Sequence, residues 1–261
     1  MTVDKAAVIR NGIVPTDRIK DIVPVIEWDL KSNYIAKNDL MLLDYLATNA
    51  WTRPLYVASP GSLGNVLNID KYFHLEGTLY RFMPVLPKPE MESIGGINID
   101  RTWDIMMNKA KFGNLNNPKV TVDRETFRNI YYERLSFTRL GYALILENRP
   151  DSAVRVADRC QQMFPPNKCG YDFFQMQLLE IYFRANSTAK GMKLANELTR
   201  IYKQNINYYL STGSFMEYWK DDIGNSFGTL QRLAGIVKKY NQPELAANIE
   251  QFIKEKAGGL R

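Results

Sequence analysis

The sequence is poor in histidine and cysteine, and this scarcity argues against several classes of enzyme. Its 261 residues contain one histidine, His74, and two cysteines, Cys160 and Cys169. A structural zinc site needs about four cysteine or histidine ligands. A serine-type triad needs a histidine and a nucleophile motif, and no G-x-S-x-G is present. The sequence therefore predicts no metal and no cofactor, and His74 is expected to be structural.

Phosphate-binding motifs and long apolar runs are also missing. Neither G-x-x-x-x-G-K-[ST] nor G-x-G-x-x-G occurs, and Gly61–Asn65 is only a turn-like fragment, weak as a phosphate cradle. No stretch reaches the ~18 apolar residues of a membrane span, and the first residues lack the layout of a signal peptide. The chain as given is expected to be soluble. Its compartment stays open, because an excised domain would also lack a targeting segment.

The charge is modestly positive and dispersed. The net charge is +6 and the pI is near 9.1. The basic residues near the C-terminus alternate with acids such as Glu244, Glu250 and Glu255, which favours a solvated helical face over a nucleic-acid-binding patch. The two cysteines are too few for a disulfide framework. A buried free thiol is favoured for Cys160, although a turn at Pro165–Asn167 would also permit a bridge to Cys169.

Residues 1–122 are predicted to form a small mixed α/β domain. Asp4 and Gly12 bracket a short helix, and Pro54 starts a strand after a second helix. The β-branched and aromatic residues and the helical spacing of leucines give the remaining assignments. The expected helices are 4–12, 38–49 and 100–109, the last capped by Asp100, and the expected strands are 22–30, 55–58 and 76–83.

Residues 123–261 are predicted to form an all-α domain of tetratricopeptide-like hairpins. Helices are expected at 124–148 and 150–164, with small residues at Ala153 and Ala157 where two helices would approach closely. The turns Asn148–Ala153 and Asn241–Ala246 are two versions of one motif. An unrelated helical bundle is the alternative. The predicted fold class is α+β, with the mixed part first and the helical repeats after it.

Several strings in the first half, above all Trp51-Thr52-Arg53-Pro54-Leu55-Tyr56 and Leu75–Arg81, resemble a specific family. They look like the soluble C-terminal region of multi-spanning Gram-negative membrane proteins similar to protein O-mannosyltransferases. That family has a Trp-x-Arg-Pro-Ile-Tyr-Phe segment, and here Leu55 and Val57 replace its isoleucine and phenylalanine. The strings that carry the resemblance are Asn38–Asp44, Asn49–Ala58, Tyr72–Phe73, Leu75–Arg81 and Gly113–Asn114.

The resemblance implies a periplasmic accessory domain on the inner membrane rather than a catalytic one. In such transferases the acidic catalytic residue lies near N-terminal membrane spans, and the sequence holds no such span. The implied function is a non-catalytic binding or scaffolding module. Its implied partners are a protein or glycan acceptor and the membrane-embedded region of the same polypeptide, with no nucleic acid.

Two groups of residues are candidate binding sites. An alternative hypothesis places a soluble enzyme's site at the junction of the halves, where Arg53 and Arg81 would hold an anionic or sugar substrate. The other residues expected around this site are Asn49, Trp51 and Glu76. Glu27 and Asp29 are instead expected to be solvated.

The inner face of the helical repeats is the second candidate. The repeat register directs Tyr142 and Phe183 to this mainly apolar face. Either the N-terminal part or a partner would cover it.

Overall fold

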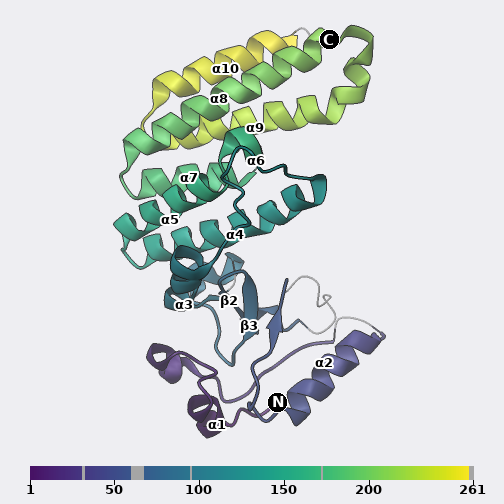
Figure 1. The fold of residues 1–261 in the computed structure, drawn as a ribbon, viewed down its shortest axis with the longest axis vertical. Helices are drawn as coiled ribbons and strands as arrows, with labels where there is room; N and C mark the ends of the chain where they lie inside the picture. Colours follow the sequence, from purple (N-terminus) through teal and green to yellow (C-terminus); the bar gives the residue numbers. More distant parts are fainter. Residues whose placement is uncertain (31–32, 60–67, 95, 172, 259–261) are drawn as a thin grey trace. The chain divides into compact units, whose positions relative to one another are not determined.

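The computed structural model describes residues 1–30, 33–59, 68–94, 96–171 and 173–258. It confirms the α+β class, with a small sheet in the first part and helices in the remainder (Figure 1). The chain divides into two compact units. The first comprises Met1–Asn114 and Tyr132–Glu147, and the second comprises Leu115–Tyr131 and Asn148–Arg261. The predicted boundary between residues 122 and 123 falls within this interleaved region.

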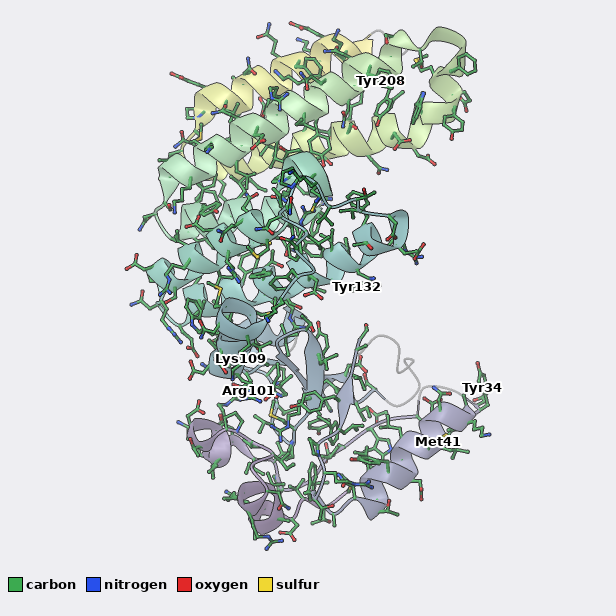
Figure 2. The ribbon with its side chains drawn as sticks, viewed as in Figure 1. Tyr34, Met41, Arg101, Lys109, Tyr132 and Tyr208 are labelled. Atoms are coloured by element: carbon green, nitrogen blue, oxygen red, sulfur yellow. The ribbon has the colours of Figure 1, made fainter. Side chains whose placement is uncertain are left out.

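Aspartate side chains that accept backbone hydrogen bonds fix where the first two α-helices of unit 1 begin. Helix α1 (Lys5–Arg10) begins after Asp4, whose side chain accepts a 2.9 Å hydrogen bond from Ala7 N. Helix α2 (Lys37–Thr48) begins near Asp39, whose carboxylate accepts from Ala36 N at 3.1 Å. The side chains of Tyr34 and Met41 are exposed beside this helix (Figure 2). A 3-10 helix, η1, covers Thr16–Asp21.

A four-stranded mixed sheet forms the centre of unit 1. Its strands are β1 (Tyr56–Val57), β2 (Phe73–Glu76), β3 (Leu79–Phe82) and β4 (Gly96–Ile97), in the order β1-β3-β2-β4. Strand β3 pairs antiparallel with β1 and β2, and β4 pairs parallel with β2. The short connecting elements are η3 (Asp70–Tyr72), η4 (Pro89–Ile94), α3 (Ile99–Trp103) and the π-helical η5 (Asp104–Lys109).

The two faces of the sheet differ in polarity, because side chains alternate along each strand. One face carries Phe73, Leu75, Tyr80 and Phe82, all buried. Phe82 stacks on Trp51 with ring centroids 6.0 Å apart. The opposite face carries polar side chains from β1, β2 and β3, namely Tyr56, His74, Glu76 and Arg81.

Three sequence predictions for unit 1 need correction. Residues 22–30 form no strand. Pro24 has no backbone N–H to donate, and the backbone groups beside it bond to two separate places, Met1 and Pro84, rather than along one neighbouring strand. Residues 76–83 form no continuous strand, because Gly77 (φ +71°) turns the chain between β2 and β3. Asn98, and not Asp100, caps the helix that follows.

Other predictions are confirmed. The helices expected from residues 38 and 124 are present as α2 and α4 (Arg124–Leu146), and the strand at 55–58 is β1. Cys160 and Cys169 are both buried and free. Glu27 and Asp29 are exposed, as expected, but in a loop. The Gly61–Asn65 fragment lies outside the described residues.

The second unit consists of helices. They are α5 (Pro150–Met163), α6 (Pro166–Cys169), α7 (Phe173–Arg184), α8 (Thr188–Ser211), η6 (Gly213–Trp219), α9 (Lys220–Lys239) and α10 (Pro243–Ala257). Helix α7 contacts α5 and α8, and α9 contacts α8 and α10. No helix in the described ranges is both long enough and apolar enough to traverse a lipid bilayer.

Three turns between these helices share one geometry. Asn148, Asn186 and Asn241 have φ values of 55°, 56° and 57°, the left-handed region that asparagine tolerates well. Each is followed two residues later by the first residue of α5, α8 or α10. Ser187 N bonds to Tyr182 O at 2.8 Å and Gln242 N bonds to Val237 O at 2.9 Å, so both turns satisfy the end of the preceding helix alike. The sequence had indicated two of these turns, and the structure adds Asn186.

Small residues lie where the helices pack. Ala195, Ala234 and Ala246 are buried on α8, α9 and α10. A Cβ atom at Gly191 would lie 2.9 Å from the Phe183 ring, so glycine is needed for this close approach.

Replacing Ala246 with arginine should therefore destabilise the second unit. Its side chain is 2% exposed, so an arginine there overpacks the contact and buries a charge. We expect a loss of roughly 3 kcal/mol or more in the free energy of unfolding, measured by urea denaturation. The neighbouring Ala247 is exposed, and Ala247→Arg is the matched control, expected to change stability by less than ~0.5 kcal/mol. Equal stability of the two variants would contradict the packing described here.

Candidate functional site

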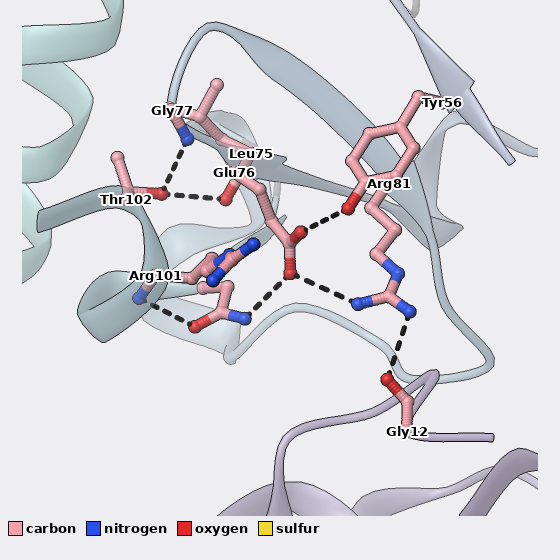
Figure 3. A network of polar contacts seen from close by, with 9 residues as sticks. Gly12, Tyr56, Leu75, Glu76, Gly77, Arg81, Arg101 and Thr102 are labelled. Carbon is pink, nitrogen blue, oxygen red and sulfur yellow. Dashed lines mark hydrogen bonds and ion pairs between the residues drawn. The ribbon is translucent and has the colours of Figure 1, made fainter. Parts of the chain in front are cut away.

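A buried carboxylate, Glu76, lies at the centre of a polar network on the sheet (Figure 3). Its side chain is 2% exposed. The Tyr56 hydroxyl donates to Oε2 at 2.6 Å, and Asn98 Nδ2 donates to Oε1 at 2.8 Å. The guanidinium of Arg81 lies 3.7 Å from Oε1. Both carboxylate oxygens are therefore engaged by protein groups.

Strand register and helix capping position these partners. Tyr56 on β1 lies opposite Arg81 on β3, which brings the phenol and the guanidinium to the same face. Asn98 follows β4 and caps α3, and its Oδ1 accepts a 3.2 Å bond from Arg101 N. Because the side-chain oxygen of Asn98 accepts this hydrogen bond from the helix, its amide nitrogen faces Glu76.

A threonine fixes the hairpin that carries Glu76. The Thr102 hydroxyl accepts from Gly77 N at 3.2 Å and donates to Leu75 O at 2.9 Å. Gly77 is required here, because a Cβ atom would lie 2.6 Å from Ile105 Cγ2 and the backbone has a positive φ.

Arg81 is held at two further points. Its Nη2 donates to Gly12 O at 3.0 Å, and its Cζ lies 5.8 Å from the centroid of the Tyr56 ring. Burial, followed by the hydrogen bond to Glu76, raises the pKa of Tyr56 to about 12. The phenol therefore stays protonated at neutral pH and keeps donating to the carboxylate.

His74 is buried on the same face of β2 as Glu76, two residues earlier in the strand. Its Nε2 lies 2.7 Å from Val85 O, and since a carbonyl only accepts, Nε2 carries the proton. Burial is the main cause that lowers the pKa of His74 to about 4. A Cβ atom at Gly96 would lie 2.1 Å from Nδ1, so the imidazole packs directly on the β4 backbone. The ring is a neutral structural group at physiological pH.

A cavity of about 320 Å³ lies beside this polar face, within unit 1. It is large enough for a small ligand, since ligand sites span roughly 300–1,000 Å³. Lys88 forms a 3.1 Å ion pair with Glu147, and Arg18 bonds to Asp21 and to Leu86 O. The apolar lining of the cavity includes Val14, Met83, Val85, Met91, Ile97 and Ile99. Its polar lining includes Asp17, Arg18, His74, Lys88, Asn98, Asp100 and Glu147.

Trp51 and Arg53, predicted as binding residues, lie in a different part of unit 1. Trp51 is 9% exposed, and its carbonyl accepts from Asn11 Nδ2 at 3.0 Å. Arg53 places its Cζ 5.7 Å from the Tyr45 ring centroid, and Asn49 binds its backbone through two hydrogen bonds. The hollow that Trp51 and Arg53 line has a volume of about 10 Å³, room for no more than one water.

The other predicted binding residues lie on helices. Tyr142, on α4, is half-buried. Phe183, on α7, is buried and stacks on Tyr240 with ring centroids 4.9 Å apart. The structure thus brings Glu76 and Arg81 together, while Trp51 and Arg53 form a separate pair.

Sequence reasoning missed the residues that complete the network. Tyr56, in the Arg-Pro-Leu-Tyr string, was predicted only as part of a strand. Asp100, and not Asn98, was predicted as the helix cap. The cavity draws on segments far apart in sequence, from Val14 to Glu147, which no local pattern links. Among the described residues, no three histidine, cysteine, aspartate or glutamate side chains gather as a metal site.

Comparison with protein-family models gives a match to the first part of the chain. Residues 1–101 match the family model of TMEM260-associated domain 2. This segment contains the sheet, the Glu76 network and most of the cavity lining. No curated protein and no solved structure matches the chain.

Removing the buried charge should destabilise unit 1. Glu76→Gln leaves Arg81 without its carboxylate, and breaking a buried pair costs roughly 3–5 kcal/mol. Glu125→Gln is the control, because Glu125 and Arg128 form an ion pair in which both side chains are more than 70% exposed. We expect that change to cost less than about 1 kcal/mol. Urea denaturation of both variants measures the difference, and similar losses would argue against a special role for Glu76.

The single histidine should make stability fall in mild acid. The folded-state pKa of His74 is about 4, below the ordinary histidine value of 6.5, so the unfolded chain binds its proton more readily. The stability that depends on neutral His74 is fully present above pH 6.5. It is lost as the pH falls toward 4, which lowers the free energy of unfolding by roughly 3 kcal/mol in all. Comparing the wild type with His74→Gln by denaturation between pH 4 and 7 isolates this effect. A difference between them that does not change with pH would refute it.

Proposed function

We propose that this chain is a non-catalytic recognition module of a membrane glycosyltransferase-like protein, acting on its extracytoplasmic side. The module binds a protein or glycan acceptor and works beside the membrane-embedded region of the same polypeptide. Its acceptor site is the 320 Å³ cavity of unit 1.

The commitment of the polar groups to internal partners is the observation that carries this proposal. A general base needs a free lone pair in reach of its substrate. Glu76 uses both oxygens for Tyr56 and Asn98, and His74 donates its Nε2 proton to Val85 O. The Nδ1 atom of His74, which carries the lone pair, is packed against the backbone of Gly96. The cavity beside them has space, apolar walls and charged groups, which suit binding rather than bond-breaking.

Two resemblances support the membrane-protein origin. The match over residues 1–101 is to a domain associated with TMEM260, and the Trp-Thr-Arg-Pro-Leu-Tyr string resembles protein O-mannosyltransferase-like membrane proteins. We infer that the C-terminal helices, with their repeated asparagine turns, form a tetratricopeptide-like scaffold.

The alternative, an enzyme that uses Arg53 and Arg81 to hold an anionic or sugar substrate, has weaker support. Arg81 is engaged by Gly12 O and Glu76, and Arg53 borders a hollow too small for a substrate. The guanidinium of Arg81 is therefore largely engaged by protein groups, and the guanidinium of Arg53 has no pocket in which to hold such a substrate.

Binding of immobilised acceptors tests the proposal. The chain is applied to an array of serine- and threonine-rich peptides of about 15 residues and to an array of glycans, and the affinity for the best ligand is measured in solution. Ile99→Trp adds bulk to the cavity wall, and we expect it to weaken that affinity about tenfold or more, which is about 1.4 kcal/mol.

The matched control is Ile9→Trp, which makes the same change at a 41% exposed residue outside the cavity lining. It should bind like the wild type. Absence of binding to both arrays would refute the recognition function, and equal weakening by the two variants would place the site away from the cavity.

A further inference from the structure

An exposed group of aromatic side chains lies where α8, η6 and α9 meet in the second unit. We call it the aromatic tip, and it consists of Tyr208, Tyr209, Phe215, Tyr218 and Trp219. Tyr208 is 59% exposed (Figure 2), Phe215 is 71% exposed and Tyr218 is 77% exposed. Large apolar side chains that gather on the surface, rather than occurring singly, mark interaction sites.

Four of the five rings of the tip, those of Tyr208, Tyr209, Tyr218 and Trp219, pack on one another. Trp219 lies at the centre, stacked on Tyr209 with centroids 5.0 Å apart and an interplanar angle of 25°. Tyr218 meets Trp219 edge-on at 4.9 Å, and Tyr208 meets it at 6.2 Å. This packing fixes the rings before a partner arrives, so little side-chain entropy is lost on binding.

The charge at the tip is opposite to that of the whole chain. Residues 204–231 contain three carboxylates, Glu217, Asp221 and Asp222, and one ammonium, Lys220, whereas the chain as a whole carries +6. Lys220 is paired with Glu217 at 3.2 Å. Burial and then the negative charge of Asp222 raise the pKa of Tyr209. Asp221 and Asp222 lie exposed in the first turn of α9.

We propose that the aromatic tip binds a basic, arginine- or lysine-rich segment of a partner protein. Cations are attracted to the faces of tryptophan and tyrosine rings, and adjacent carboxylates strengthen the attraction. Aromatic side chains in a fixed cluster are also the usual anchors of protein interfaces. Residues 204–231 carry a net negative charge, so the tip attracts a basic segment even though the chain as a whole is positive. This surface is separate from the cavity of unit 1 and does not depend on the function proposed for it.

A membrane surface fits the tip less well. Tyrosine and tryptophan do favour the lipid interface, but peripheral contacts with anionic lipids rely on lysine and arginine beside the aromatic residues. Here the carboxylates outnumber the ammonium, so an anionic headgroup layer would be repelled.

Titration of the chain into a dye-labelled, end-capped hexa-arginine peptide, followed by fluorescence anisotropy, tests the proposal. We expect saturable binding that weakens as salt screens the charges. Two double variants should each reduce the affinity about tenfold or more, Phe215→Ser with Tyr218→Ser and Asp221→Asn with Asp222→Asn. The second pair keeps the side-chain shape, so it reports on charge even if the first pair disturbs folding.

Tyr34→Ser is the matched control, since Tyr34 is 73% exposed but lies outside the tip. It should bind the peptide like the wild type, and circular dichroism should give the same helicity for every variant. Peptide binding that is absent, or that survives both double variants, would overturn the proposal. So would binding to neutral phosphatidylcholine vesicles that the aromatic variant abolishes while the peptide does not bind, because the tip would then be a membrane contact.

Discussion

The buried carboxylate of Glu76 is the constraint around which the first unit is organised. A charge that is 2% exposed is stable only if its oxygens are hydrogen-bonded and its charge is paired. Tyr56, Asn98 and Arg81 meet these needs from three other strands or strand ends. The network therefore couples all four strands through one side chain, and Arg81 extends it to the backbone of Gly12.

The same commitment explains why this face of the sheet is better suited to recognition than to catalysis. Reactive groups in enzymes keep a free lone pair or proton directed at the substrate. Here the groups of suitable chemistry are turned inward, and the adjacent cavity is bordered by methionine, valine and isoleucine with charges at its margin. Rigid walls and a few polar contacts give selectivity without chemical change.

The sequence predicted the helices well because their signals are local. Asp4 as a cap and Pro150 as the first residue of α5 act within one turn. The sheet was harder to predict, because residues 22–30 have strand-like composition but no single neighbouring strand to pair with. Glu76 and Arg81 were both among the predicted site residues and lie 3.7 Å apart, yet their partner Asn98 could not be found, since parallel pairing of β2 with β4 depends on tertiary packing. Trp51 was selected for its unusual string, and its burial against Phe82 gives that string a structural reason.

The position of His74 has a consequence for regulation. Histidine is the side chain whose ordinary pKa lies where cells vary their pH, and it is the usual proton sensor. This chain has only one, and the pKa of that one is about 4. No histidine here gains charge on moving from neutral to mildly acidic surroundings. If a partner associates with this chain in one compartment and leaves it in a more acidic one through a histidine, that histidine would have to lie on the partner.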